Sequence, residues 1–199
     1  GNTPTASALL SIESFNTFKE QLSYSTPLTK NLSTSISLSK VDSDGYIENN
    51  YLDRNDTSGL NELSMKSKSI YQNDYLKAVL NIHNHQFNNG FDYFTQDNSL
   101  QTKSDKPGED DQSILAGSLK LEYGNNKRKF VTLISHLNEN SLYSYDEDWG
   151  NNPLWNSTPG YNADYDYNIE FTKNRRHYYL DQRVIFENQL VLGVYHRNT

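Results

Sequence analysis

The 199-residue sequence contains no cysteine, which excludes a disulfide framework and a thiolate metal site. Hydrophobic residues make up only 34% of it and the mean hydropathy is -0.86, poor material for the core that a soluble domain of this length normally buries. The longest apolar stretch, near 190–195, is far shorter than the roughly 20 residues that a membrane-spanning helix needs. Any contact with a membrane would therefore be made by strands.

Basic residues are also few, since 18 Lys and Arg stand against 25 Asp and Glu. Binding to a phosphate backbone needs clustered cations, so no nucleic acid partner is expected. The sequence has no phosphate-binding glycine loop, nucleophile elbow or zinc-protease helix, and we expect neither an enzyme nor a bound cofactor. Aromatic residues, in contrast, are abundant, with 15 Tyr, 8 Phe and 2 Trp. Disordered chains are poor in aromatic residues, so this chain is expected to fold.

Alternation of apolar and polar residues with a period of two recurs along the chain. It is clearest where Leu32, Ile36 and Leu38 alternate with serines, so that one face of the strand is apolar and the other small and polar. Such patterns predict about nine strands, at 7–14, 17–25, 32–39, 61–71, 76–82, 115–123, 129–137, 178–186 and 189–197.

The connections between these strands alternate in length. Short turns are predicted at 26–30, 72–74, 124–127 and 187–188, and long connections at 42–60, 83–112 and 138–172. In an up-and-down meander the long connections then share one edge, as in bacterial outer-membrane barrels. The alternative is a soluble β-sandwich, in which loops longer than about 15 residues are uncommon.

The pattern therefore predicts an all-β fold: an antiparallel up-and-down transmembrane β-barrel segment of roughly nine strands. Nine strands leave a bacterial barrel incomplete, so residues 7–199 are expected to form part of a barrel. Residues 1–6 are a candidate end of a preceding plug or linker. The side chains expected to face lipid are Leu32, Ile36, Leu38, Leu76, Leu80, Ile82, Leu119 and Leu121.

Three segments, in this order, resemble TonB-dependent receptors. The first is Asp-Gly-Tyr-Ile-Glu-Asn at 44–49, continuing through 51–57 to 61–63. The second is Asn-Gly-Phe-Asp-Tyr-Phe at 89–94, with 97–98 and Ser-Asp-Lys-Pro-Gly at 104–108 downstream. The third runs from 141 to 149, followed by the return strand that ends at 179–183. The resemblance covers nearly the whole chain.

This resemblance implies a bacterial outer-membrane importer of a scarce nutrient. The expected ligand is an iron–siderophore complex, with vitamin B12 or an oligosaccharide as other substrates of the family. In the family an amino-terminal plug domain couples the barrel to TonB, and no plug is recognised in these residues, so transport is expected of the parent protein. The expected partners are the outer-membrane bilayer and the small-molecule ligand. The alternative function is a soluble β-rich carbohydrate-binding module.

The third long connection is the best candidate for a ligand site. It contains aromatic residues among Asn and Asp, and such rings can stack on a sugar or an aromatic siderophore. The alternative is the aromatic girdle that anchors outer-membrane barrels at the lipid interface. The candidate residues are Tyr143, Tyr145, Trp149, Trp155 and Tyr161, followed by Tyr165 and Tyr167.

Other polar residues are candidates for metal or anion binding, and a solvated surface is the alternative for each of them. His83 and His85 have a spacing that can hold a metal if a third ligand approaches. The acidic runs 109–111 and 146–148 could collect Ca²⁺. We favour a polar rim for the histidines and solvated loops for the acids, and predict no metal site. Arg175 and Arg176 are expected to be solvated, with anionic lipid or an anionic ligand as the alternative.

Overall fold

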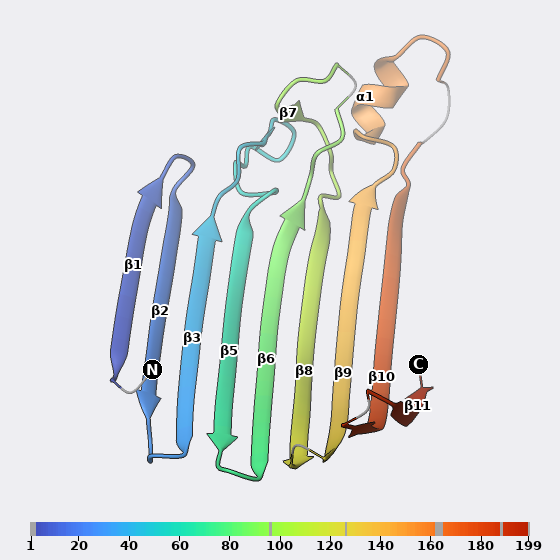
Figure 1. The fold of residues 1–199 in the computed structure, drawn as a ribbon. Helices are drawn as coiled ribbons and strands as arrows, with labels where there is room; N and C mark the ends of the chain where they lie inside the picture. Colours follow the sequence, from blue (N-terminus) through green and yellow to red (C-terminus); the bar gives the residue numbers. More distant parts are fainter. Residues whose placement is uncertain (1–2, 96, 126, 162–164, 188, 199) are drawn as a thin grey trace.

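A computed structural model describes residues 3–95, 97–125, 127–161, 165–187 and 189–198 of the chain. Nine strands form one antiparallel sheet in the order β1-β2-β3-β5-β6-β8-β9-β10-β11 (Figure 1). Each strand pairs with its predecessor along the sheet, so the predicted up-and-down meander is confirmed. The strands are β1 (Thr5–Glu13), β2 (Thr17–Pro27), β3 (Leu32–Ser43), β5 (Leu60–Gln72), β6 (Leu76–Phe91), β8 (Gly108–Gly124), β9 (Arg128–Asp146), β10 (Asn168–Phe186) and β11 (Val191–Asn198).

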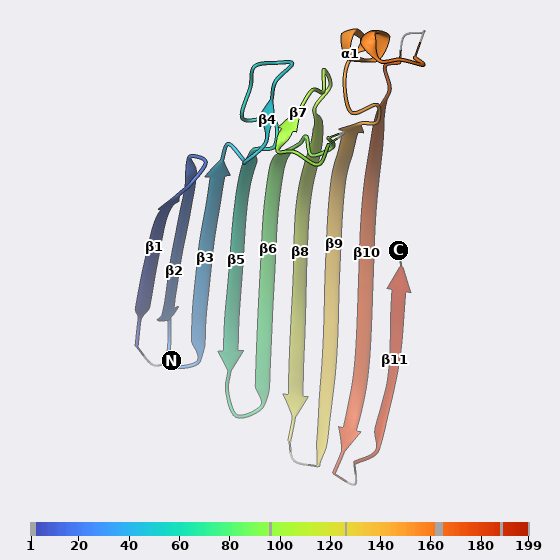
Figure 2. The same cartoon turned by 90° about the horizontal axis from the view of Figure 1, so that it is seen from above.

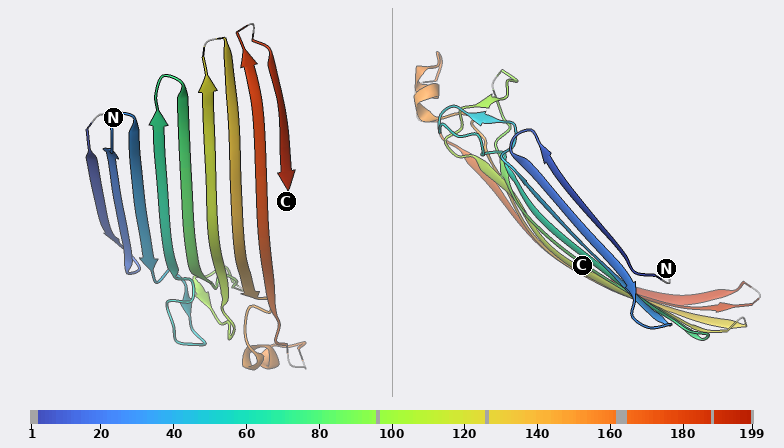
Figure 3. Two further views of the ribbon diagram at one scale, coloured as in Figure 1. Left: turned by 90° about the horizontal axis from the view of Figure 1, so that it is seen from below. Right: turned by 90° about the vertical axis from the view of Figure 1, so that its left-hand side faces the viewer.

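The sheet is a single curved layer with all its long loops at one end (Figures 2 and 3). Strands β1 and β11 are its edges, and each has one neighbour among the described residues, so the sheet is not closed into a barrel. The first strand begins at Thr5, within the segment 1–6 assigned to a linker. No helix in the described part of the chain has the length and apolarity to cross a membrane.

The two faces of the sheet differ sharply in chemistry. Directly opposed residues of paired strands project from the same side. Leu80 is opposite Leu119, which is opposite Ile134. By this register the eight Leu and Ile side chains expected to face lipid do share one face, which we call the apolar face. The other, polar face carries Ser, Lys, His and charged pairs such as Glu139 with Arg175, with scattered aliphatic side chains such as Val79 and Leu133 between them.

Most strands are longer than predicted, and four of them are much longer. Strands β6, β8, β9 and β10 have 16 to 19 residues, because they continue beyond the alternating apolar stretch toward the loops. There the face that is apolar nearer the turns becomes polar, as at Asn84, Gln86 and Asn138, so a period of two cannot be read from hydropathy although the backbone ladder continues. The long connections shrink accordingly to 44–59, 92–107 and 147–167.

These three connections pack together at one end, and we call their described residues the loop cap. They contain the two-residue strands β4 (Glu48–Asn49) and β7 (Gln101–Thr102), which pair in parallel, and the short helix α1 (Asn152–Ser157). Tight turns join the strands at the opposite end, as predicted; Asn126 and Asn188 lie outside the described residues. The one-sided distribution of long loops is thus confirmed.

The described part of the sheet has no hydrophobic core. Among the described residues the buried hydrophobic side chain is Ile47, which belongs to the loop cap, and it is 4% exposed. Leu80, in the middle of the apolar face, is 41% exposed. The second sheet that a β-sandwich requires is not found in the described part of the chain, where the other sheet is the β4–β7 pair.

Candidate ligand-binding site

A buried polar network ties the first two loops of the cap together. Asn49 has no exposed surface, and its Nδ2 donates to Asp92 Oδ2 at 2.8 Å and to the Ser104 carbonyl at 2.9 Å. Its Oδ1 accepts from the backbone N–H groups of Tyr51 (3.1 Å) and Leu52 (2.9 Å). Each polar group of this amide therefore has a partner, as burial requires. The network fixes the loops as a folded unit.

A second network fixes the third loop around Asp148. Its Oδ1 accepts from Trp155 Nε1 at 3.0 Å and its Oδ2 from the Tyr167 N–H at 2.8 Å. The side chain of Asn151 caps α1 by accepting from the Leu154 N–H at 2.9 Å, and donates to the Lys103 carbonyl at 2.7 Å. The N-cap residue of α1 therefore also joins the third loop to the second.

Two glycines allow close backbone approach at the loop end of the sheet, Gly90 between β6 and the cap and Gly108 between β8 and β9. A Cβ at Gly90 would collide with the Thr57 carbonyl oxygen, and one at Gly108 with that of Ser144. Both neighbours are backbone atoms, so larger residues would force the chain apart. Gly90 and Gly108 both belong to the second of the three segments that resemble the receptor family.

Nine aromatic rings form a continuous cluster where the cap meets the sheet, and we call this cluster the aromatic platform. Phe94 stacks on Trp149 with ring centroids 5.4 Å apart and an interplanar angle of 12°. Phe91 meets Tyr143 edge-on at 4.9 Å, a favourable geometry for aromatic pairs. The members are Phe15, Tyr46, Phe91, Tyr93, Phe94, Tyr143, Tyr145, Trp149 and Phe171.

The platform lies at the loop end of the polar face. Tyr143 is opposite Phe171 and Asp110, and this register places it on the same side as Glu139 and Arg175. Tyr143 and Tyr145 belong to β9, and their prediction as loop residues is wrong. A lipid-interface girdle would need these rings on the apolar face. Rings on that face include Tyr123 and Phe130, opposite each other at the turn end, and Phe18 at the loop end.

The five candidate residues divide between two clusters. Tyr143, Tyr145 and Trp149 belong to the platform. Trp155 and Tyr161 lie 4.7 Å apart in a separate group on and after α1, where Tyr165 also contacts both rings. The sequence does not distinguish these groups, because all five residues fall within one connection. The structure separates the two groups because Tyr143 and Tyr145 belong to β9, which ends beside the cap.

Several platform residues were missed as site residues. Phe91, Tyr93 and Phe94 lie in the segment used for the family resemblance, yet they supply the centre of the platform. The signal in the sequence that could have identified them is three aromatic residues within four positions, close to a predicted strand. Phe15 and Tyr46 extend the platform toward β1 and are 58% and 49% exposed.

The acidic run 146–148 is not a solvated loop, contrary to our prediction. Asp146 and Asp148 are 5% and 3% exposed, and only Glu147 points to solvent. Asp146 lies at the loop end of β9, beyond the apolar stretch. Burial raises its pKa from 3.8 to about 6 against an opposing contact with Ser104, and the carboxylates of Asp148 and Asp105 add to the increase. The junction between β9 and the cap is therefore expected to respond to pH near 6.

The histidine pair lies on the polar face of β6. The rings of His83 and His85 stack with centroids 6.3 Å apart, and His85 Nδ1 is hydrogen-bonded to Ser64 Oγ at 2.9 Å. No group of three or more potential metal ligands is found among the described residues. Arg175 forms an ion pair with Glu139 at 3.3 Å, whereas Arg176 is exposed on the apolar side.

The platform offers half-exposed rings beside a fixed cap, which suits stacking on a flat or ring-containing solute. Trp149 and Phe171 are 41% and 56% exposed, so their rings are available to a ligand. No family model matches the chain, and no curated protein matches it.

Proposed function

We propose that the chain forms part of the wall of a bacterial outer-membrane β-barrel of the TonB-dependent receptor type. The parent protein imports a scarce nutrient, an iron–siderophore complex, and the aromatic platform is the place where this ligand binds. The observation that carries the proposal is a one-layer sheet with an uncovered apolar face and a polar face that ends in the platform.

The apolar face is chemically suited to lipid. Large hydrophobic side chains are exposed there without a protein layer over them, including Leu80 at 41% and Ile134 at 48%. Water would make such a surface costly, at about 25 cal/mol for each Å² of apolar area. Hydrocarbon removes that cost, which supports a bilayer as the missing partner.

The apolar band crosses the sheet obliquely. In the row of opposed residues that contains Leu22, Leu38 and Met65, strands β9 and β10 carry Asn138 and Arg176. The band has thus moved toward the turns by the time it reaches β9 and β10. A flat bilayer can match an oblique band only if the strands tilt, and strands of membrane barrels do tilt by about 35–45°. The band therefore supports a barrel wall better than a flat sheet.

Platform and polar face would then line one continuous path. In a membrane barrel the face opposite the lipid encloses the lumen. The platform lies on that face at the loop end, where a solute from outside arrives first. Its rings can stack on an aromatic siderophore or a sugar, and nearby Asp110 and Gln112 of β8 add polar groups.

Membrane insertion is the first test. The parent protein is produced with a secretion signal and the cell envelope is fractionated. We expect recovery in the outer membrane and a requirement for detergent. A monomer that stays soluble in plain buffer would refute the receptor proposal and favour the carbohydrate-binding module.

Ligand binding is tested by replacing a central ring. Trp149→Ala removes the partner that stacks on Phe94 and should weaken binding of a ferric siderophore by about tenfold, which corresponds to about 1.4 kcal/mol. Binding is measured by fluorescence quenching and uptake by radioactive iron. In the receptor family energy coupling belongs to the plug domain and not to the barrel loops, so the ligand concentration for half-maximal uptake should rise while the maximal rate stays unchanged.

Two further variants define the site. Tyr75→Ala changes a ring in a turn at the opposite end of the sheet, 68% exposed, and should leave binding unaltered. Trp155→Ala probes the separate cluster at α1. If Trp155→Ala weakens binding and Trp149→Ala does not, the ligand binds at α1 and the platform assignment is wrong.

A further inference from the structure

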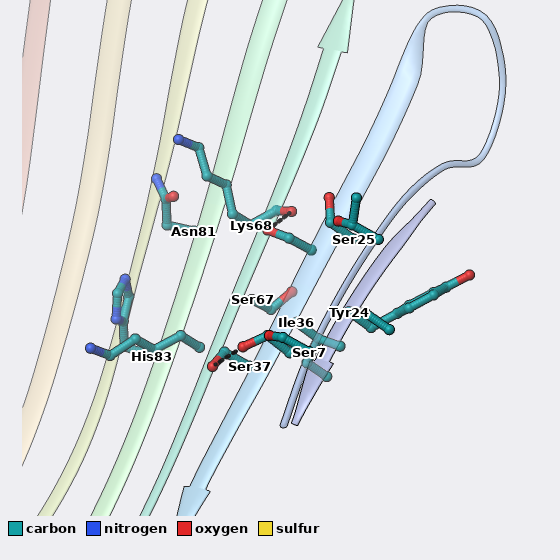
Figure 4. Close-up of a pocket in the computed structure, with 14 residues that line it drawn as sticks. Ser7, Tyr24, Ser25, Ile36, Ser37, Ser67, Lys68, Asn81 and His83 are labelled. Carbon is teal, nitrogen blue, oxygen red and sulfur yellow. Dashed lines mark hydrogen bonds between the residues drawn. The ribbon is translucent and has the colours of Figure 1, made fainter. Parts of the chain in front are cut away.

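A hollow of about 610 Å³ lies over β1, β2, β3, β5 and β6 (Figure 4). Most of its lining comes from two adjacent rows of opposed residues on the polar face. One row runs through Ser7, Ser23, Ser37, Lys66 and His83, and the next through Thr5, Ser25, Ser35, Lys68 and Asn81. Small hydroxyl side chains on β1 to β3 leave the space, and longer cationic and polar side chains on β5 and β6 bound it.

The hollow is rich in hydrogen-bond donors. Figure 4 shows Lys68, Asn81 and His83 on one side of the sheet, whereas Tyr24 extends from the other. Ser23 and Ser37 are hydrogen-bonded to each other at 3.0 Å, which orients two of the hydroxyls. The described lining residues include neither Asp nor Glu. Ammonium, amide, imidazole and hydroxyl groups together suit an oxyanion.

Several cations on other strands of the same face have acidic partners, although Lys173 of β10 has none among the described residues. Ion pairs join Lys19 to Glu13 at 2.8 Å, Lys129 to Glu122 at 2.5 Å and Arg175 to Glu139 at 3.3 Å. Within the described ranges neither Lys66 nor Lys68 has an acidic partner. An exposed lysine in bulk water needs none. Inside a lumen, however, low-dielectric walls strengthen a local positive potential and attract anions.

We propose that this hollow binds a carboxylate or phosphate oxyanion through Lys66, Lys68 and the serine hydroxyls. The inference rests on the proposed function, because only a closed barrel makes the polar face a lumen. The oxyanion has two sources: an anionic solute on its way through the lumen, or an acidic side chain of a segment of the parent protein seated there.

The test uses the parent protein purified in detergent, with citrate and inorganic phosphate as probes in titration calorimetry at low salt. Replacing both lysines (Lys66→Gln with Lys68→Gln) should weaken binding of the probe at least tenfold, and added salt should weaken wild-type binding as well. Lys120→Gln is the matched control. It is the same substitution on the same face, at a cation already paired with Glu122 at 2.7 Å, and should leave the affinity unaltered.

A photo-crosslinking residue at Ser37 distinguishes the two sources. Probe binding that depends on both lysines identifies a free anion. Absence of probe binding, with a cross-link from position 37 to an acidic segment of the same protein that the double variant loses, identifies an internal carboxylate. Both results support the oxyanion site. Probe binding that the double variant retains, or the absence of both signals, overturns it.

Failure of this inference and failure of the proposed function are separable. A protein that is found in the outer membrane and binds a siderophore through Trp149, but shows no oxyanion signal, refutes only the hollow. A protein that stays soluble without detergent refutes the barrel. Because Lys66 and Lys68 are exposed, the double variant should fold, and unchanged heat-modifiability in electrophoresis confirms that it does.

Discussion

The loop cap and the sheet reverse the usual division between core and surface. In the cap, polar side chains such as Asn49, Ser58 and Ser104 are buried at 0–1% exposure and the loops hold one another. In the sheet, leucines and isoleucines are exposed on one face, and the strands are joined by the backbone ladder and by side-chain bonds on the polar face such as Ser23–Ser37. The cap therefore supplies its own partners, whereas the apolar face of the sheet has no cover among the described residues.

The hydrogen bonds within the cap explain how its long loops are held in one shape. Loops longer than about 12–15 residues are uncommon in compact domains and are often functional. Here their order comes from hydrogen bonds within the cap, so the platform beside them has a fixed shape before a ligand arrives. Fixing the site in advance lowers the entropic cost of binding.

The largest loss of stability is expected in the sheet, at Leu80 on the apolar face. Leu80→Arg places a charge in the middle of the apolar face and should cost about 2 to 4 kcal/mol of unfolding free energy in a bilayer. The measurement is denaturant unfolding in lipid vesicles. Val79→Arg puts the same charge on the polar face of the same strand and should cost far less. Equal losses for both variants would show that the apolar face does not meet lipid.

A smaller and local effect is expected at Asn49. Asn49→Ala leaves the N–H groups of Tyr51 and Leu52 without their acceptor, at about 1 to 3 kcal/mol for buried groups left unpaired. The cap should open to proteases while the strand signal in circular dichroism stays unchanged. Asn50→Ala is the control, because its side chain is exposed and only its backbone binds Thr102. Loss of the sheet in Asn49→Ala would show that cap and sheet are not independent.

The smallest expected effect is a dependence of the stability of the cap on pH. The folded pKa of Asp146 is raised to about 6, so proton binding favours the folded cap. Stability from this group is fully present below the unfolded value near 3.8 and is lost as the pH rises through about 6. Cap opening, followed by tryptophan fluorescence in denaturant, should need less denaturant at pH 7 than at pH 5. Asp146→Asn should remove this difference; a pH dependence that persists in the variant assigns it to another group.

Much of the sheet could be read from the sequence because the side-chain period in a strand is two. Leu32, Ile36 and Leu38 alternate with serines, and the structure places all three on one face. Tight turns and long connections were also placed correctly at opposite ends. Strand lengths were not, because beyond the apolar stretch Asn84 and Asn138 leave no alternation to read although the backbone remains paired.

The sequence by itself determined the all-β class, the strand order, the shared apolar face and the aromatic wealth of the third connection, all of which follow from local periodicity and composition. Only the tertiary structure decided which aromatic rings contact one another in the platform. Phe91, Phe94 and Tyr143 come from different strands and loops and join because the register of β6, β8 and β9 brings them to one end. It also decided that Asp146 is buried, because burial depends on the surrounding loops and no local pattern encodes them.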